Sequence, residues 1–358
     1  MKKHNFSAGP AILPQKVMQE AALAVLDFNG MGLSILEISH RTKDFEAVMA
    51  ETEALIREIG GFDDSFAVLF LGGGASSQFF MVPMNLLGEN EKAAYIDTGV
   101  WASKALKEAK AFGQVEVLAS SKESNYTYIP KNYEVPKDAI YLHLTSNNTI
   151  YGSQYHWWPE TETPIVCDMS SDMFSRPFDA NKFGLIYAGA QKNIGPAGVT
   201  LVIVKKDLLG RTGRTLPTML EYRTHAKDGS MHNTPPVFPI YVMMLTLRWI
   251  KSLGGLIPME ERNRQKQALL YTEIDTNPCF KGTVSVEDRS WMNICFLPTN
   301  PDFEAPFFEM CKDAGIVGLK GHRSVGGFRA STYNALELES VQVLVDVMRD
   351  FARKHGDA

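Results

Sequence analysis

Between residues 66 and 204 the sequence repeats short, almost wholly apolar runs, which are separated by helix-like or polar segments. The runs are FAVLFL (66–71), KAAYID (92–97), QVEVLA (114–119), AIYLHLT (139–145), PIVCDMS (164–170), LIYAGA (185–190) and GVTLVIV (198–204). Near-continuous apolar strands are typical of a sheet that helices cover on both faces, because neither face meets water. We therefore expect an α/β fold whose large domain holds a mostly parallel sheet covered by helices.

Helix signals lie before and between these runs. Thr42 is placed to cap a helix that ends near Gly60, and two acidic residues follow it in the first turn. Further helices are expected at 14–28, from Ser77 onward and at 101–112.

A chain of 358 residues is too long for one simple core. After an apolar helix expected at 237–253, Gly254, Gly255 and Pro258 interrupt the pattern, and a smaller α+β unit follows. In that unit we expect strands at 291–297 and 326–333 and helices at 306–314 and 335–355. The predicted parts are an N-terminal segment (1–15) that packs on the small domain, a large domain (16–257) and a small C-terminal domain (258–358).

Charge and composition exclude several classes of function. The net charge is −5 and no basic cluster is dense, so a nucleic acid is not an expected partner. The most apolar helix-like run, 237–250, is shorter than the roughly 20 apolar residues that a membrane span needs. The four cysteines lack metal-type spacing and no signal segment is visible, so we expect a cytoplasmic protein without a metal site.

Two residues stand out at the ends of neighbouring strands. Asp168 lies inside an apolar run, and a buried carboxylate needs a compensating partner such as a protonated ring nitrogen. Lys192 ends the next strand, and a desolvated lysine becomes a nucleophile toward carbonyls. A surface lysine would be the ordinary interpretation of Lys192 alone, but a cofactor that forms a Schiff base accounts for both residues.

Other strand ends carry polar or aromatic residues that fit the same interpretation. The GGGASS turn (72–77) before a helix suits an anion, although it is not a P-loop and a plain tight turn stays open. Trp101 fits either the core or a flat face for an aromatic ring, and Thr149 lies in a polar cluster. The basic groups His40–Arg41 and His322, Arg323 and Arg329 are either surface charge or binding groups for carboxylate and phosphate.

Several segments in order resemble a known family. They are NFSAGPA, GGGAS, TGVW, CDMSSD, GAQKNIGPAG, HNTPPVFPIY and GHRSVGGFRASTYN, which run from the N-terminus to residue 334. These segments are similar to those of the phosphoserine aminotransferase family, which comprises class V aminotransferases of fold type I that use pyridoxal 5'-phosphate.

The resemblance implies roles for the residues already described. Lys192 would bind the cofactor covalently and move a proton, Asp168 would pair with the ring nitrogen, and Trp101 would stack on the ring. Ala75, Ser76 and Gln191 would hold the cofactor phosphate, and Thr149 would contact the ring edge. Asn233 and Thr234 would reach the cofactor phosphate of a neighbouring subunit, which implies a homodimer with shared active sites.

The resemblance also implies where the substrates bind. Arg329 would bind the substrate α-carboxylate, and His40 and Arg41, with His322 and Arg323 of the partner, would bind the second anionic group. Some family members carry an arginine where this chain has Ala75, Ser76 and Ser77, so the substrate phosphate would rest on these His and Arg residues.

The implied reaction transfers the amino group of L-glutamate to 3-phosphohydroxypyruvate and yields O-phospho-L-serine and 2-oxoglutarate. The longer 4-carbon phosphorylated substrate, which leads to 4-phosphohydroxythreonine in pyridoxine biosynthesis, stays open. The alternatives are another class V enzyme, such as a cysteine desulfurase or a serine–glyoxylate type aminotransferase, and a non-catalytic anion-binding protein. A desulfurase needs a cysteine on an exposed mobile loop, and the sequence offers none.

Overall fold

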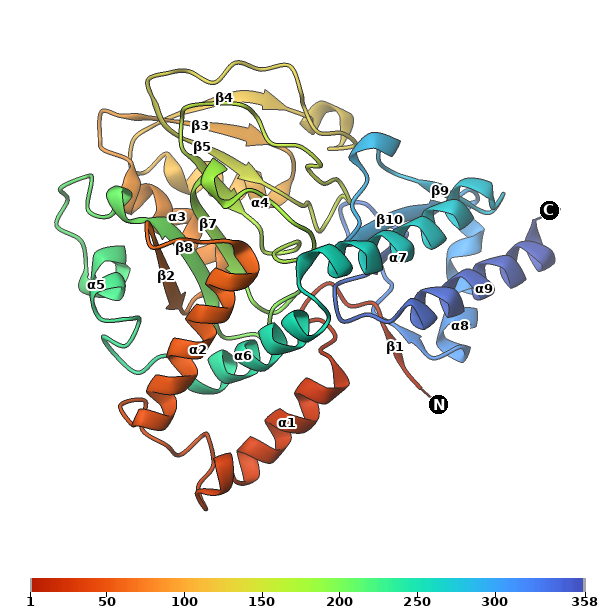
Figure 1. Cartoon of the computed structure of the whole chain (residues 1–358). Helices are drawn as coiled ribbons and strands as arrows, with labels where there is room; N and C mark the ends of the chain where they lie inside the picture. The colour runs from red at the N-terminus through yellow and green to blue at the C-terminus, as the bar shows by residue number, and fades with distance from the viewer. Residues whose placement is uncertain (1, 357–358) are drawn as a thin grey trace.

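The structure is a computed structural model that describes residues 2–356. Met1 and residues 357–358, which belong to the first and last expected parts, lie outside the described residues. The main feature of residues 2–356 is a seven-stranded sheet in the order β2-β8-β7-β6-β5-β3-β4 (Figure 1). The strands are β2 (Phe66–Leu71), β3 (Lys92–Asp97), β4 (Gln114–Ser120), β5 (Ala139–Thr145), β6 (Ile165–Asp168), β7 (Phe183–Gly189) and β8 (Thr200–Lys205). Each predicted apolar run forms one of these strands.

The sheet is mostly parallel, as the sequence predicts. Strands β7, β6, β5, β3 and β4 pair in parallel, whereas β8 pairs antiparallel with both β2 and β7. The reversed direction of β8 follows from its short connection, since residues 190–199 leave no room for the helical crossover that a parallel pair needs. The carboxyl ends of all strands except β8 therefore meet at one edge of the sheet.

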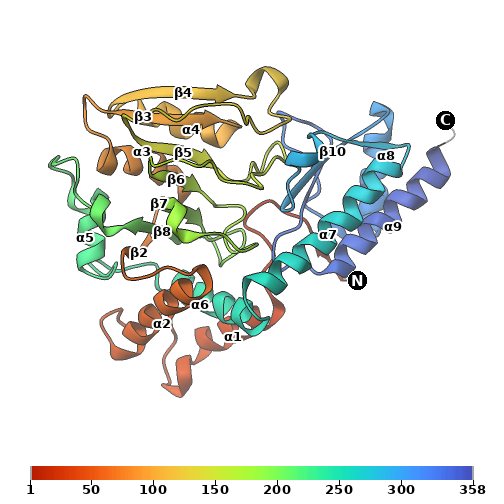
Figure 2. The ribbon, with the colours of Figure 1, turned by 45° about the horizontal axis from the view of Figure 1, so that its top comes forward.

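Helices cover both faces of the sheet (Figure 2). On one face lie α1 (Gln15–Leu26), α2 (Lys43–Gly60) and α6 (Val237–Ser252), and on the other lie α3 (Gly74–Leu86), α4 (Val100–Ala109) and α5 (Tyr222–Lys227). Consecutive strand residues alternate between the two cores: Ile186 belongs to the first, and Leu185 and Tyr187 belong to the second. Because both faces are dry, the strands carry apolar residues at nearly every position.

The starts of two helices show where local sequence signals succeed and where they fail. The Thr42 hydroxyl accepts a hydrogen bond from the Phe45 N–H at 3.4 Å, so the predicted cap of α2 is confirmed. The prediction that the next helix begins at Ser77 is wrong, because α3 begins at Gly74. The turn uses two glycines with positive φ, Gly73 at +88° and Gly74 at +67°, and a Cβ on Gly73 would lie 2.0 Å from Ser77 Oγ. The helix therefore starts within the glycine run, at Gly74.

The C-terminal part of the chain forms a second core beside the carboxyl-end edge of the sheet (Figure 1). An antiparallel sheet in the order β12-β10-β9 packs against three helices. The elements are α7 (Leu256–Thr276), β9 (Phe280–Gly282), β10 (Asn293–Pro298), α8 (Glu304–Asp313), β11 (Ile316–Val317), β12 (Phe328–Ser331) and α9 (Leu338–His355). The N-terminal strand β1 (His4–Asn5) pairs in parallel with β11, and Phe6 lies in the same core.

Short 3-10 helices join these elements. They are η1 (Phe28–Gly30), η2 (Lys122–Ser124), η3 (Ala180–Lys182), η4 (Lys206–Leu208), η5 (Thr218–Leu220), η6 (Val286–Asp288) and η7 (Pro301–Phe303). Among residues 2–356, no single helix is long and apolar enough to cross a membrane; α6 and α7 pass that test only as a pair bent by 87°.

Candidate active site

A cavity of about 150 Å³ lies at the carboxyl-end edge of the sheet, and we name it the Lys192 cavity. It is lined by Gly74, Ala75, Ser76, Phe79, Trp101, Thr145, Asn147, Thr149, Asp168, Ser170, Ser171, Gln191 and Lys192. The sequence-predicted cofactor residues in this set are Ala75, Ser76, Trp101, Thr149, Asp168, Gln191 and Lys192. They meet because ligands of parallel sheets collect where the carboxyl ends of the strands lie side by side.

Lys192 follows β7 and points its amine at the opposite wall of the cavity. Its Nζ donates a hydrogen bond to Thr149 Oγ1 at 2.8 Å. Burial lowers the pKa of Lys192 to about 8, although the Asp168 carboxylate opposes this shift. A large share of this amine is therefore neutral near pH 8 and able to attack a carbonyl.

Asp168 ends β6 and is 5% exposed. Burial raises the pKa of its carboxyl group, against a hydrogen bond from the Ser170 N–H to Oδ1 at 2.9 Å and against the charge of Lys192. The raised pKa means that the protein alone compensates the buried carboxylate incompletely. A cationic ring nitrogen in the cavity would supply the missing compensation.

The other end of the cavity is suited to an anion. Gly74, Ala75 and Ser76 form the first turn of α3, where backbone N–H groups lack helical partners and the helix dipole is positive. Gln191 lies opposite this turn in the same lining, and a Cβ on Gly189 would come within 2.6 Å of its Oε1. The glycine therefore leaves the room that the Gln191 side chain occupies.

Trp101 forms an aromatic wall of the cavity. It lies in the first turn of α4, and its ring centroid is 6.4 Å from that of Phe79. Its buried Nε1 has no hydrogen-bond partner among the described residues. Lys104 Nζ lies 4.6 Å from the ring centroid, so Trp101 is not simply packed into the core.

Arg329 brings positive charge to the same region, and His322 lies within reach of that charge. Arg329 Nη1 donates to the Thr149 carbonyl oxygen at 3.2 Å, and its charge contributes to lowering the pKa of Lys192. Burial, followed by the charges of Arg329, Arg323 and Lys104, lowers the pKa of His322. His322 therefore lies within the electrostatic reach of Arg329 of its own chain, and its service to the partner subunit's site stays a prediction.

Six of the predicted residues do not reach the Lys192 cavity of this chain. His40 and Arg41 precede α2, Asn233 and Thr234 lie in an exposed segment before α6, and His322 and Arg323 lie between β11 and β12. Within residues 2–356, none of the six lines the cavity or forms a side-chain hydrogen bond with its lining residues. Arg41, Asn233 and Thr234 are exposed.

The lining also contains residues that the sequence did not single out: Phe79, Thr145, Asn147, Ser170 and Ser171. Ser170 and Ser171 lie two and three residues after Asp168, and Phe79 lies one helical turn after Ala75. Nearness to Asp168 in the sequence and helical spacing from Ala75 could therefore have indicated these residues. Thr145 could have been found from its position as the last residue of a predicted strand.

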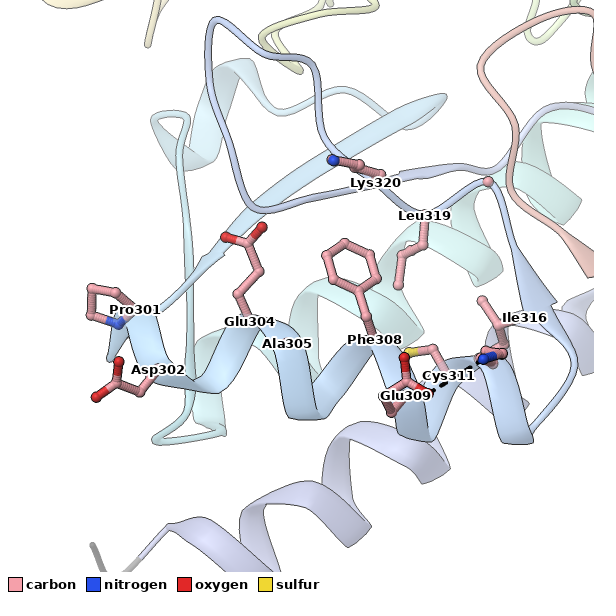
Figure 3. Close-up of a pocket in the computed structure, with 12 residues that line it drawn as sticks. Pro301, Asp302, Glu304, Ala305, Phe308, Glu309, Cys311, Ile316, Leu319 and Lys320 are labelled. Carbon is pink, nitrogen blue, oxygen red and sulfur yellow. Dashed lines mark hydrogen bonds and ion pairs between the residues drawn. The ribbon is translucent and has the colours of Figure 1, made fainter.

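A larger hollow of about 730 Å³ lies elsewhere, on the C-terminal part of the chain (Figure 3). Glu304 and Phe308 of α8 point toward the segment that carries Leu319 and Lys320. This hollow contains none of the predicted site residues and no buried carboxylate–lysine pair. Size alone therefore does not identify the active site, and the chemistry favours the Lys192 cavity.

Pyridoxal 5'-phosphate fits the residues of this smaller cavity. The cavity offers an amine with a lowered pKa, a buried carboxylate, free N–H groups at a helix start and an aromatic wall. The unpaired Trp101 Nε1 and Thr145 Oγ1 also leave hydrogen-bonding capacity in its walls. Among the described residues, no group of three or more His, Cys, Asp or Glu side chains is placed to hold a metal ion.

Comparison with known proteins agrees with a site for pyridoxal 5'-phosphate. The family model for aminotransferase class V matches residues 3–344. The chain belongs to the class V aminotransferase family. It is 61% identical, over 99% of its length and 100% of the relative, to the phosphoserine aminotransferase of Flavobacterium psychrophilum.

Solved structures of such enzymes share the whole fold. The phosphoserine aminotransferase from Bacillus circulans subsp. alkalophilus superimposes with a TM-score of 0.97 at 49% identity, over 99% of each chain. The PLP-bound phosphoserine aminotransferase from Trichomonas vaginalis superimposes with a TM-score of 0.91 at 36% identity, over 97% of this chain and 100% of that chain. The expected fold, enzyme class and cofactor are confirmed: this class V family member is a transaminase that uses pyridoxal 5'-phosphate.

Proposed function

We propose that the Lys192 cavity transfers the amino group of L-glutamate to 3-phosphohydroxypyruvate, forming O-phospho-L-serine and 2-oxoglutarate. The full-length similarity to phosphoserine aminotransferases at 61% identity carries this proposal. When bound, pyridoxal phosphate supplies an aldehyde that accepts the amino group and a ring that delocalises electrons.

The residues of the cavity divide this chemistry among them. Lys192 Nζ would hold the cofactor covalently and, when free, would take the proton from the substrate α-carbon. The depressed pKa of Lys192 suits this role, because a general base works best when its pKa is near the working pH. Asp168 would hold the ring nitrogen in its protonated state, and Trp101 would provide a flat face for the ring.

The remaining cofactor contacts fix its two ends. Ala75, Ser76 and Gln191 hold the phosphate at the start of α3, and Thr149 contacts the ring edge beside Lys192. These groups orient the reacting atoms so that the proton transfer needs little rearrangement.

The substrate's two anionic groups require cations at the cavity mouth. Arg329, a partly buried arginine beside Thr149, binds the α-carboxylate, which both substrates share. His322 and Arg323 bind the distal group, which is the phosphate of one substrate and the side-chain carboxylate of the other.

A second copy of the chain completes this site with His40, Arg41, Asn233 and Thr234. Large apolar residues are exposed on and after α1, just before His40: Met18, Leu23, Leu26, Met31, Leu33 and Leu36. Leu26 alone is 78% exposed, and α1 lies at the outside of the molecule (Figure 1). Such a cluster is typical of a protein–protein interface, which supports a homodimer with shared sites.

Two further assignments accompany the reaction. The enzyme works in the cytoplasm, which agrees with four free, buried cysteines. The buried cysteines also argue against a cysteine desulfurase, because an attacking thiol must be accessible. Use of the longer 4-carbon substrate of pyridoxine biosynthesis stays a prediction.

The experiment that tests this function compares 3-phosphohydroxypyruvate with unphosphorylated hydroxypyruvate as acceptors. We expect kcat/KM to be at least about 100-fold higher with the phosphorylated substrate, because charge-assisted hydrogen bonds to its phosphate are lost without it. Arg323→Gln should lower the ratio of kcat/KM for the phosphorylated acceptor to kcat/KM for the unphosphorylated one. Arg353→Gln, at an exposed arginine of α9, should leave this ratio unchanged. Equal rates with both acceptors would refute the phosphate-binding role.

A further inference from the structure

Thr145, the last residue of β5, has a hydroxyl group that the protein leaves unused. It is 2% exposed, it lines the Lys192 cavity, and its Oγ1 has no hydrogen-bond partner among the described residues. Burying an unpaired hydroxyl costs free energy, so its presence in a cavity wall points to a partner that binds there.

The register of the sheet places this hydroxyl beside Asp168. Thr145 of β5 is paired directly with Asp168 of β6. Directly paired residues of neighbouring strands project their side chains to the same face. Both side chains therefore line the same end of the Lys192 cavity.

Asp168 has room for another donor. Its described donor is one residue, Ser170, which acts through the backbone N–H at 2.9 Å and through the side chain, although an ionised carboxylate accepts at about four lone-pair positions. Its neighbour on the other side is Tyr187, which is paired with it in β7. The Tyr187 hydroxyl lies 2.9 Å from His143 Nε2 and is engaged there, so Thr145 is the flanking hydroxyl that is free.

We propose that Thr145 is a positioning residue of the cofactor site, whose hydroxyl donates to the Asp168 carboxylate once the ring nitrogen holds that carboxylate ionised. This inference rests on the proposed role of Asp168. The Thr145 hydroxyl adds a donor from a second residue to the donor residue Ser170, and thereby keeps the carboxylate aimed at the ring nitrogen.

Thr200, the first residue of β8, offers a matched control. It is fully buried and its Oγ1 also has no partner among residues 2–356, but it does not line the Lys192 cavity. Thr200→Val and Thr145→Val thus make the same isosteric change at unpaired hydroxyls of one sheet. A purely structural role of Thr145 predicts the same result from both.

The test measures how apoprotein binds pyridoxal phosphate, by titration of the lysine-bound absorption band and by the rise in Tm that the cofactor causes. We expect Thr145→Val to weaken binding about 5–10-fold and to reduce the rise in Tm. Thr145→Ser, which keeps the hydroxyl, and Thr200→Val should stay within about twofold of the unaltered protein. The Tm of each apoprotein shows that the variants are folded.

Unaltered binding in Thr145→Val, or equal weakening in Thr200→Val, would overturn the inference and leave the proposed function intact. Failure of the unaltered protein to form the lysine-bound band would overturn both.

Discussion

Lys192 and Arg41 are both cations of the proposed site, and the chain holds them in opposite ways. Lys192 ends a buried strand and is surrounded by residues from four other strand ends, all of the same chain. Arg41 is exposed on the segment before α2 and does not line the cavity. The residues that line the Lys192 cavity thus come from separate strand ends of one chain, whereas Arg41 lies outside that cavity.

Residues at strand ends and residues on exposed segments are held in place by different means. Strand ends are fixed by the sheet, so Asp168 and Lys192 keep their relative positions without any ligand or partner. Residues on exposed segments gain fixed positions only through another surface. The comparison therefore predicts that changes at residues lining the cavity act within a subunit, whereas changes at Arg41 act across the dimer.

The largest expected effect comes from Lys192→Ala. Removing the amine removes both covalent cofactor binding and the general base, so we expect kcat to fall by at least about 10³-fold. The lysine-bound absorption band should also disappear. Lys206→Ala changes another lysine that follows a strand, but an exposed one, and should leave both unchanged. A retained band in Lys192→Ala would exclude this lysine as the attachment site.

Asp168→Asn should have the next largest effect. The amide cannot hold the ring nitrogen protonated, and breaking a buried charge pair costs about 3–5 kcal/mol, which corresponds to a loss in kcat of about 160- to 5,000-fold. The apoprotein should be no less stable, because burial already disfavours the Asp168 charge. Steady-state kinetics checks the loss in kcat, and the Tm of the apoprotein checks its stability. A fully active variant would show that Asp168 has no role in the mechanism.

Arg329→Lys should act on substrate binding more than on chemistry. Lysine keeps the charge but loses the planar fork, so we expect KM to rise about 10-fold for L-glutamate and 3-phosphohydroxypyruvate alike. Both substrates are affected because both carry an α-carboxylate. A rise for one substrate alone would reassign Arg329 to the distal anionic group.

The smallest effect is a pH dependence of cofactor uptake. The pKa of Lys192 is about 8, so the rate at which apoprotein forms the lysine-bound band should rise about tenfold per pH unit below pH 8 and level off above it. Continued increase up to pH 10 would show an ordinary lysine. Asp168→Asn should shift the profile to lower pH, since the Asp168 charge raises the pKa of Lys192.

The same pKa affects the stability of the apoprotein. An unfolded lysine titrates near 10.5, above the folded value, so the unfolded state binds more protons between about pH 8 and 10.5. The cost of burying Lys192 is therefore fully present below pH 8 and is lost as the pH rises through that window.

Sequence reasoning selected seven residues that the structure brings together in the Lys192 cavity, because the relevant signals are local. Apolar runs located the strands, and Asp168 and Lys192 were anomalous within or beside them. The start of α3 was placed too late, because a run of three glycines is typical of a loop. In the structure the last of these glycines, Gly74, already belongs to the helix. The reversed direction of β8 follows from the short connection between β7 and β8. The length of that connection is known only once the bounds of both strands are known.

The anion-binding end was harder to predict, since no local pattern tells which subunit a residue serves. His322 is expected to serve the partner, and its nearness in charge to Arg329 of its own chain does not tell the two subunits apart. Thr145 was missed because a threonine at the end of a strand is ordinary until its unpaired hydroxyl is seen beside Asp168. The division of the chain at residues 15 and 257, like the roles of the site residues, stays a prediction.

One experiment tests the shared construction directly: Lys192→Ala and Arg41→Ala subunits are dissociated, mixed and allowed to reassociate. If Arg41 serves the partner's cavity, each mixed dimer has one site with both changes and one unaltered site. With random mixing, half of the dimers are mixed, so activity should return to about a quarter of that of the unaltered enzyme. If activity stays at the level of the separate variants, Arg41 serves its own subunit's cavity and the account is wrong.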